Sequence, residues 1–346
     1  MRLEEFDYHL PEDRIAQRPC EMRDHARMMV INRKTGSIIH DTFLHIPHYL
    51  QKGDALIVND SKVIPAKLRG KRESGGSVEM LLLSRKSDDT SPCPVWEVLL
   101  KPARRMQVGD KIFFHNRVHA TITRRISEKK WLITFVPQMD FEAFLSGYGN
   151  VPLPPYIKRK NDDASHHNDA ERYQTVYAKI PGSVAAPTAG LHFSELILDV
   201  LEKKGVHVVS VTLHVGYGTF LPVESSHVEE HVMEEEHFVI DKDASDIINS
   251  AGNVIAVGTT STRVIESVAD EKGTVRAHSS STDLFIYPGY RFRRVNTLLT
   301  NFHLPRSSLF LLVCAFAGTD LIHEAYRRAI ENGYRFYSYG DCMLIM

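Results

Sequence analysis

The sequence predicts an α/β protein, with a core domain on a mostly parallel sheet and an inserted small β-barrel domain. After residue 181, short apolar strands alternate with amphipathic helices, an order typical of parallel sheets. Between residues 66 and 136, strand patterns follow one another without a long helix, which is typical of a small barrel. We therefore expect a discontinuous core domain over residues 1–66 and 152–346 and a barrel domain over residues 67–151.

Composition is that of an ordinary globular protein. The 346 residues are 43% hydrophobic and 25% charged, and this length suggests two domains. The longest apolar run, residues 309–317, is too short to span a bilayer, and the N-terminus has no hydrophobic signal core. The four cysteines are scattered and form no Cys-x-x-Cys pair, so we expect reduced thiols and no zinc site. These observations predict a cytoplasmic protein without a membrane segment.

Positive charge is concentrated in the barrel segment. Residues 66–136 contain 15 Lys and Arg against 7 Asp and Glu, although the whole chain has a net charge of −1. A basic module in a near-neutral chain is a candidate surface for a phosphate backbone. The alternative is that these side chains only keep a β surface soluble.

Short elements are predicted before and around the barrel. The first 65 residues predict a hairpin over residues 28–40 and a buried strand over residues 55–60. The barrel segment predicts strands over residues 78–83, 95–100, 111–115, 118–126 and 131–136. Residues 151–156 predict a stiff, proline-rich linker, and the polar residues 158–170, which include a His pair, predict a loop.

Residues 181–222 are the most informative stretch. They contain a loop of small residues, a helix, a strand and a second glycine loop. Ser194 fits an N-cap, and the helix that it begins ends at Gly205. We expect its apolar face to be formed by Leu196, Ile197, Val200 and Leu201.

The strand that follows places a histidine at its carboxyl end. Apolar and polar residues alternate from Val209 to Val215, so His214 lies on the polar face, directly before the loop of Gly216 to Thr219. Ligands of open α/β sheets bind outside the carboxyl ends of strands. This favours a site at His214. The alternative is that the loops are tight turns and His214 is a surface group.

The C-terminal part continues the βα pattern. We predict strands over residues 254–257, 283–287, 295–300 and 334–339, and helices that begin at 258–263 and span 308–317 and 320–332. The helix after residue 257 begins with hydroxyl side chains, and such a helix N-terminus suits an anionic or carboxylate group. Polar residues also follow the other strands, as in Asn59-Asp60-Ser61, in Asn301 to His303 and at Asp341. This layout suits a transferase that binds a polar small molecule with an acid and a base.

Three other motifs are weaker. His227 to His231 matches the H-x-x-E-H pattern of one metalloprotease class, but the segment is crowded with glutamates and has little apolar surface to form a stable helix. Gly216-Tyr217-Gly218 lacks the third glycine of a Rossmann turn. Ser183 and Cys342 have neither a nucleophile elbow nor a base at the required spacing.

Long blocks of this chain resemble one family closely. The blocks GSVAAPTAGLHF (182–193) and TNFHLPRS (300–307) are highly specific, and further matches follow in order along almost the whole chain. The chain resembles the S-adenosylmethionine:tRNA ribosyltransferase-isomerase family of queuosine biosynthesis. The matching segments are residues 59–66, 152–157, 173–178, 182–193, 211–216, 218–220, 257–261, 282–290, 300–306 and 338–341.

The resemblance implies an unusual transfer reaction. The ribosyl moiety of S-adenosylmethionine would pass to 7-aminomethyl-7-deazaguanine at the tRNA wobble position and isomerise there, giving epoxyqueuosine-tRNA, adenine and methionine. S-adenosylmethionine would be consumed as a substrate, with no cofactor and no metal. The expected partner is a tRNA with a GUN anticodon, and we expect a monomer. Two other classes compete with this expectation, namely a methyltransferase and an RNA-binding module without turnover.

The resemblance and the strand-end pattern together give a set of candidate residues. The acid–base candidates are His192, His214 and His303, followed by His231 and Glu236. The substrate-binding candidates are Asn59, Asp60, Ser61, Gly182, Ser183, Thr188, Gly190, Gly216, Gly218, Thr219, Thr259, Thr260, Ser261, Arg263, Asn301 and Asp341. The tRNA-binding candidates are Lys67, Arg69, Lys71, Arg72, Arg104 and Arg105. The resemblance implies a histidine where this chain has Glu234. If that histidine acts as a base, either Glu234 replaces it or the assignment is wrong.

Overall fold

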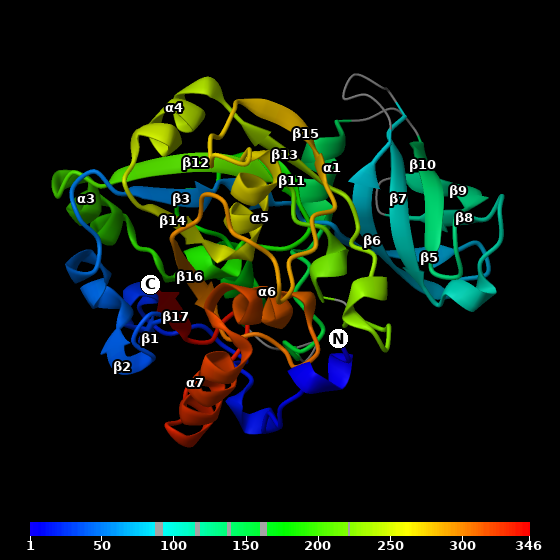
Figure 1. The fold of residues 1–346 in the computed structure, drawn as a ribbon. Coiled ribbons are helices and arrows are strands. Elements are labelled where there is room, and N and C mark those ends of the chain that lie inside the picture. The colour runs from blue at the N-terminus through cyan, green and yellow to red at the C-terminus, as the bar shows by residue number, and fades with distance from the viewer. Residues whose placement is uncertain (87–92, 115–117, 137–139, 160–164, 221) are drawn as a thin grey trace.

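A large mixed sheet forms the centre of the molecule (Figure 1). The computed structural model describes residues 1–86, 93–114, 118–136, 140–159, 165–220 and 222–346. Nine described strands form the sheet in the order β15-β13-β12-β3-β14-β16-β17-β1-β2. Their bounds are β1 Arg27–Asn32, β2 Ser37–Thr42, β3 Ala55–Asn59, β12 His207–Leu213, β13 Glu236–Ile240, β14 Val254–Val257, β15 His278–Thr282, β16 Thr297–Asn301 and β17 Cys342–Ile345.

The middle of this sheet is buried on both faces. In β3, Ala55 and Ile57 face one hydrophobic cluster while Leu56 and Val58 face another, because successive side chains of a strand point to opposite sides. Helices α4 to α7 contribute to the first cluster, and α3 with the 3-10 helices η4 and η7 contributes to the second. These bounds are α3 Glu195–Lys203, α4 Lys242–Ser250, α5 Gly258–Val268, α6 Ser308–Ala317, α7 Thr319–Glu331, η4 Phe43–His48 and η7 Thr188–His192.

Six described strands close into a barrel that stands beside the core (Figure 1). Apolar side chains alternate inward along the strands and form their own cluster, to which Phe141 and Leu145 of α1 (Phe141–Tyr148) also belong. The barrel strands are β5 Lys67–Arg72, β6 Ser77–Arg85, β7 Val95–Lys101, β8 Lys111–Phe113, β9 His119–Arg125 and β10 Lys130–Val136. Strand β5 was not predicted, because five of its six residues are charged or glycine and Leu68 is its one apolar side chain.

The chain enters and leaves the barrel at one place. The backbone N–H of Lys67 donates to the carbonyl of Asn150 at 3.0 Å, and the N–H of Asn150 donates back at 2.9 Å. The two crossing segments are therefore hydrogen-bonded to each other. The remaining elements are β4 Ser61–Val63, β11 Ile180–Ser183, α2 Ser165–Arg172, η1 Leu3–Phe6, η2 Glu12–Arg14, η3 Arg23–His25, η5 Ala103–Arg105, η8 Tyr217–Phe220 and η9 Val228–Glu230.

The predicted fold class, an α/β core with an inserted barrel, is confirmed, and the sheet itself is mixed. Strands β12, β3, β14 and β16 are parallel, and so are β17 and β1. The pair of β16 with β17 and the pairs at both edges of the sheet are antiparallel. No single described helix is long and apolar enough to span a membrane. Helices α6 and α7 have the required length and apolarity only when taken together, and a bend of 115° separates them.

Several local predictions were wrong. Residues 283–287 and 334–339 form no strand, and the neighbouring segments β15 and β17 are the ones that join the sheet. Part of the predicted loop over residues 158–170 is helix α2, and the side chains of its His pair lie outside the described residues. On α3, Ile197 and Leu201 are buried, but Leu196 and Val200 are 65% and 40% exposed.

Candidate active site

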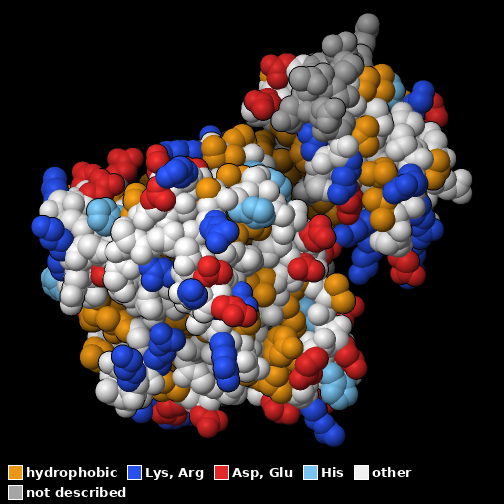
Figure 2. All heavy atoms as spheres, turned by 45° about the horizontal axis from the view of Figure 1, so that its top comes forward, with side chains coloured by type: hydrophobic (Ala, Val, Ile, Leu, Met, Phe, Trp, Pro, Cys, Tyr) orange, Lys and Arg blue, Asp and Glu red, His pale blue; other side chains and the backbone are white. Residues whose placement is uncertain are grey.

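A cleft of about 1370 Å³ lies between the core and the barrel. Its core side is formed by β4, β11, the end of β12 and the start of β13, and its barrel side by β6, β7, β10 and α1. This volume is larger than the ~300–1,000 Å³ that a drug-sized ligand usually occupies, so the cleft has room for more than one small group. Figure 2 shows the barrel as a separate lobe with many Lys and Arg side chains on its surface.

His214 lies in this cleft directly after β12. Its Nδ1 atom is buried and has no hydrogen-bond partner among the described residues. The ring stacks on His237 with the centroids 6.1 Å apart, and it packs against the Cα of Gly182. Burial lowers the pKa of His214, and the neighbouring His237 lowers it further. At neutral pH the ring is therefore an uncharged imidazole that can accept a proton.

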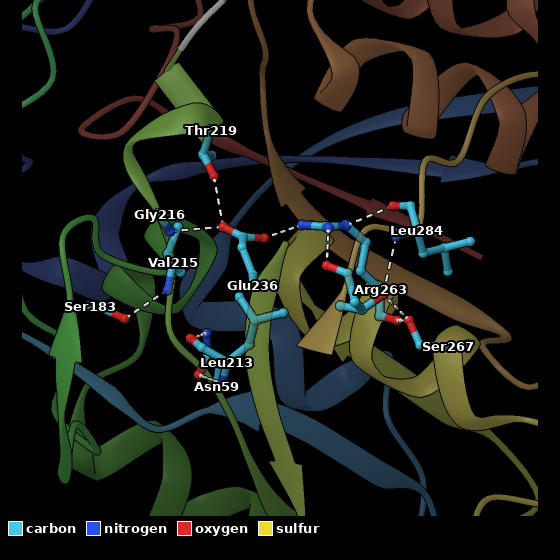
Figure 3. A network of polar contacts seen from close by, with 11 residues as sticks. Asn59, Ser183, Leu213, Val215, Gly216, Thr219, Glu236, Arg263, Ser267 and Leu284 are labelled. Atoms are coloured by element: carbon cyan, nitrogen blue, oxygen red, sulfur yellow. Dashed lines mark hydrogen bonds and ion pairs between the residues drawn. The ribbon is translucent and has the colours of Figure 1, made fainter. Parts of the chain in front are cut away.

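Glu236 fixes the glycine loop beside His214. Its Oε1 accepts hydrogen bonds from the Gly216 N–H at 2.8 Å and from Thr219 Oγ1 at 3.4 Å, and its Oε2 pairs with Arg263 (Figure 3). Both ion-pair side chains are nearly fully buried. With both carboxylate oxygens engaged in this way, Glu236 acts in this structure as a positioning residue for the loop.

Arg263 is held by its own set of acceptors. Its Nε donates to the Leu284 carbonyl at 2.9 Å and its Nη2 to the Thr282 carbonyl at 3.3 Å (Figure 3). The guanidinium therefore connects α5, the segment after β15 and β13. Its hydrogen bonds go to protein groups, so it supports the site from behind and does not offer a free cation to a ligand.

Glu234, which follows the H-x-x-E-H segment, joins the two lobes. Its carboxylate pairs with Lys130 of barrel strand β10, and Lys130 also lies 3.4 Å from Glu97 of β7. A Cβ on Gly218 would lie only 2.9 Å from Glu234 Oε2, so the loop packs tightly against this carboxylate. The structure therefore shows an ion pair between core and barrel at this position.

The floor of the cleft is fixed by short polar side chains. Asn59 Oδ1 accepts from the N–H groups of Ser61 at 3.1 Å and Leu213 at 3.0 Å. Ser183 Oγ donates to Ser61 Oγ at 2.8 Å. It also accepts from the Val215 N–H at 3.0 Å (Figure 3). These bonds join β3, β4, β11 and the end of β12, so Asn59, Ser61 and Ser183 hold the backbone around His214 in place.

Asp60 is a buried carboxylate at the same place. Its Oδ1 accepts from Thr212 Oγ1 at 2.7 Å, and its carbonyl accepts from the Lys179 N–H at 2.7 Å. Burial raises the pKa of Asp60, and the hydrogen bond from Thr212 and the charge of Lys179 oppose that shift.

The N-terminus of α5 has unpartnered hydroxyl groups. Thr259, Thr260 and Ser261 are buried, and neither Thr260 Oγ1 nor Ser261 Oγ has a partner among the described residues. Gly258 begins the helix with a φ of +85° and lies beside Ala189 of η7. The hydroxyls and backbone N–H groups here suit a carboxylate.

Of the acid–base and substrate-binding candidates, only His214, Glu236, Gly182 and Gly216 line the cleft. His192 bonds Asn301 at 3.1 Å and His303 bonds Thr300 at 2.7 Å, both rings are buried, and burial lowers the pKa of each to about 3. His231 packs on Phe285 away from the cleft lining. Thr188 and Gly190 lie in η7, where a Cβ on Gly190 would collide with Tyr177, and Asp341 accepts backbone N–H groups from Arg27 and Arg335.

The cations that line the cleft differ from those expected. Lys67, Arg69, Lys71 and Arg72 lie on β5, and Arg104 and Arg105 on η5, none of them in the cleft lining. The cleft is lined instead by Lys62, Arg85, Lys86, Lys130 and Lys179. Net charge identifies the barrel as basic but does not tell which of its faces turns toward the core.

The H-x-x-E-H segment does not form a metal site within the described part of the chain. His227 and His231 flank η9, a 3-10 helix of three residues, so they are not on one face of a stable helix. No group of three His, Cys, Asp or Glu side chains in the described residues could hold a metal ion.

The chain matches a known protein family over almost its whole length. The model of the family described as "queuosine biosynthesis protein" matches residues 3–345, so the chain belongs to this family. The resemblance inferred from the sequence is confirmed.

Individual proteins of the same family are similar to this chain over almost its whole length. Proteins named S-adenosylmethionine:tRNA ribosyltransferase-isomerase from Syntrophus aciditrophicus and Caldanaerobacter subterraneus are 56% and 49% identical to this chain, and each match covers 100% of both proteins. The crystal structure of S-adenosylmethionine tRNA ribosyltransferase from Thermotoga maritima matches with a TM-score of 0.55 and 34% identity, over 99% of this chain and 100% of that one. This chain, like these relatives, is an enzyme.

Proposed function

We propose that this enzyme transfers the ribosyl moiety of S-adenosylmethionine to 7-aminomethyl-7-deazaguanine at the wobble position of a GUN-anticodon tRNA and isomerises it. The products are epoxyqueuosine-tRNA, adenine and methionine. S-adenosylmethionine is consumed as a substrate and no further cofactor takes part. The enzyme acts as a cytoplasmic monomer.

The observation that supports this proposal most directly is His214 in the cleft. The sulfonium of S-adenosylmethionine acidifies the neighbouring C5′ protons, so the reaction first needs a base at that carbon. His214 is neutral at working pH and its Nδ1 has no partner among the described residues. We assign it the removal of this proton.

The loops around His214 are held in one arrangement. Gly182 lets the backbone lie directly against the imidazole ring, and Glu236 accepts the Gly216 N–H and so fixes the second loop. The carboxylate of the methionyl group is assigned to the α5 N-terminus with Thr260 and Ser261, where hydroxyls lack partners in the described structure. The six basic residues on β5 and η5 are assigned to tRNA backbone outside the cleft.

Product analysis tests this function. Mixing the enzyme with S-adenosylmethionine and precursor-bearing tRNA should release adenine and methionine, and omitting the precursor base should abolish the release. S-adenosylhomocysteine as the product would instead identify a methyltransferase. Binding of tRNA without any small-molecule product would identify an RNA-binding protein, and either result would refute the proposal.

A further inference from the structure

A two-stranded ribbon forms part of the cleft floor. Strand β4 pairs in parallel with β11, and Pro181 lies opposite Lys62 in the register. Ser61 and Val63 are buried while Lys62 between them is exposed, as the alternation of a strand requires. Lys179, directly before β11, is also exposed, and both lysines line the cleft.

This ribbon is fixed relative to His214. The Ser183 hydroxyl bonds Ser61 on the neighbouring strand and the backbone N–H of Val215, the residue after His214. The N–H of Lys179 donates to the Asp60 carbonyl at 2.7 Å. The Cα atoms of the two lysines therefore keep a constant position relative to His214, while their long side chains remain free to move.

The two lysines differ from other cations of the cleft. Lys86 pairs with Glu97 at 3.3 Å, and Lys130 pairs with Glu97 and Glu234. Among the described residues, no carboxylate forms an ion pair with Lys62 or Lys179. These two charges are available to an incoming anion.

Several carboxylates on the facing walls of the cleft are already paired with cations. Glu234 pairs with Lys130, Glu97 with Lys86 and Lys130, and Glu236 with Arg263. An RNA phosphate that enters the cleft is therefore attracted to the ribbon, where the two lysines have no ion-pair partner in the described structure.

We infer that Lys62 and Lys179 bind the RNA phosphates next to the nucleotide that enters the cleft. This assignment rests on the proposed function and adds to it the residues that position the RNA. Phosphates held at the ribbon leave the base of that nucleotide within the cleft that contains His214. The lysines thereby set the register of the RNA strand, and the basic residues on β5 and η5 contact RNA elsewhere.

Equilibrium binding of an RNA hairpin tests the inference. The probe is an unmodified anticodon stem-loop with a GUN anticodon, titrated with the full-length K62A/K179A variant at several salt concentrations. Two lost single-strand phosphate contacts should reduce the slope of log K against log salt by about 1.4 and weaken binding about 10- to 30-fold near 0.1 M salt. The charge-matched control is K242A/K272A, two exposed lysines outside the cleft lining, which should bind RNA as the unaltered enzyme does.

The outcomes separate the inference from the proposed function. If K62A/K179A keeps the unaltered slope, or loses no more affinity than K242A/K272A, the inference is wrong. If it loses affinity for S-adenosylmethionine while RNA binding is unchanged, the lysines bind the small substrate and the inference is again wrong. Thermal unfolding of both variants checks that they fold. Because RNA binding is measured without turnover, its result does not depend on the product analysis of the unaltered enzyme.

Discussion

Gly182 sets the position of the His214 ring. A Cβ at this residue would lie 2.7 Å from His214 Nδ1 and 2.8 Å from Cε1, closer than real side-chain contacts allow. The φ of Gly182 is +142°, which an L-amino acid rarely adopts. A residue other than glycine would therefore move either the imidazole or the loop.

We expect Gly182→Ala to reduce kcat by roughly 100-fold, because a displacement of a reacting group by about 1 Å has this order of effect. Turnover should be measured as adenine release. Gly252→Ala is the matched control, since a Cβ there meets nothing within 4 Å. In a His214→Ala background, Gly182→Ala should cause little further loss; two independent losses would show that Gly182 does not act through His214.

The three histidines predicted first as acid–base candidates show what a sequence can establish about single residues. His192, His214 and His303 all follow loops or strands with similar polar neighbours. The structure gives His192 and His303 buried hydrogen-bond partners and leaves only His214 in the cleft. Sequence position predicts that a polar side chain lies at a strand end, but the packing of other elements decides whether it is open to a substrate.

At the scale of elements, a buried ion pair connects β13, α5 and the glycine loop. Glu236 and Arg263 are each about 5% exposed. Removing one partner of such a pair leaves a buried charge without compensation. The pair therefore couples the stability of the fold to the arrangement of the loop of Gly216 and Thr219.

We expect Glu236→Gln to lower the free energy of unfolding by about 3–5 kcal/mol, measured by denaturant titration. Adding Arg263→Met should recover much of this loss, because the uncompensated charge is then removed. Glu324→Gln, which breaks exposed ion pairs on α7, is the control and should leave the midpoint nearly unchanged. An equally small effect of Glu236→Gln would contradict the assigned role of the pair.

Local sequence patterns predicted most elements, but they failed where contacts with distant parts of the chain decide which segment joins the sheet. The Ser194 cap, α3, α5, α6 and α7 were predicted because capping and periodicity are local signals. Residues 334–339 are rich in aromatic residues and look like a strand, but Tyr337 has a φ of +71° and the next segment, β17, fills the sheet. Leu196 and Val200 are exposed because α3 presents a narrower face to the core than its apolar residues suggest.

For the whole molecule, two buried histidines make stability depend on pH. Burial lowers the pKa of His192 and His303 to about 3, below the value of about 6.5 in an unfolded chain. The unfolded state thus binds more protons than the folded state between pH 6.5 and pH 3. Stability is therefore fully present above pH 6.5 and falls as the pH falls through this range.

We expect each of these histidines to lower the free energy of unfolding by about 1.4 kcal/mol for each unit by which the pH falls between pH 6 and pH 4. His303→Asn removes one titrating group and can still bond Thr300, so its stability should depend less steeply on pH. Denaturant titrations at pH 7, 6, 5 and 4 measure the difference. His9→Asn at an exposed position is the control, and a His303→Asn curve parallel to that of the unaltered protein would contradict the burial argument.

The backbone contact between Lys67 and Asn150 has an evolutionary consequence. Because the entering and leaving segments are hydrogen-bonded to each other, the two ends of the barrel segment meet at one place. Mutations that lengthen barrel turns or exchange its surface charges leave the strand order of the core sheet unchanged. Under the proposed function, selection can thus change the RNA contacts of the barrel while the residues around His214 stay the same.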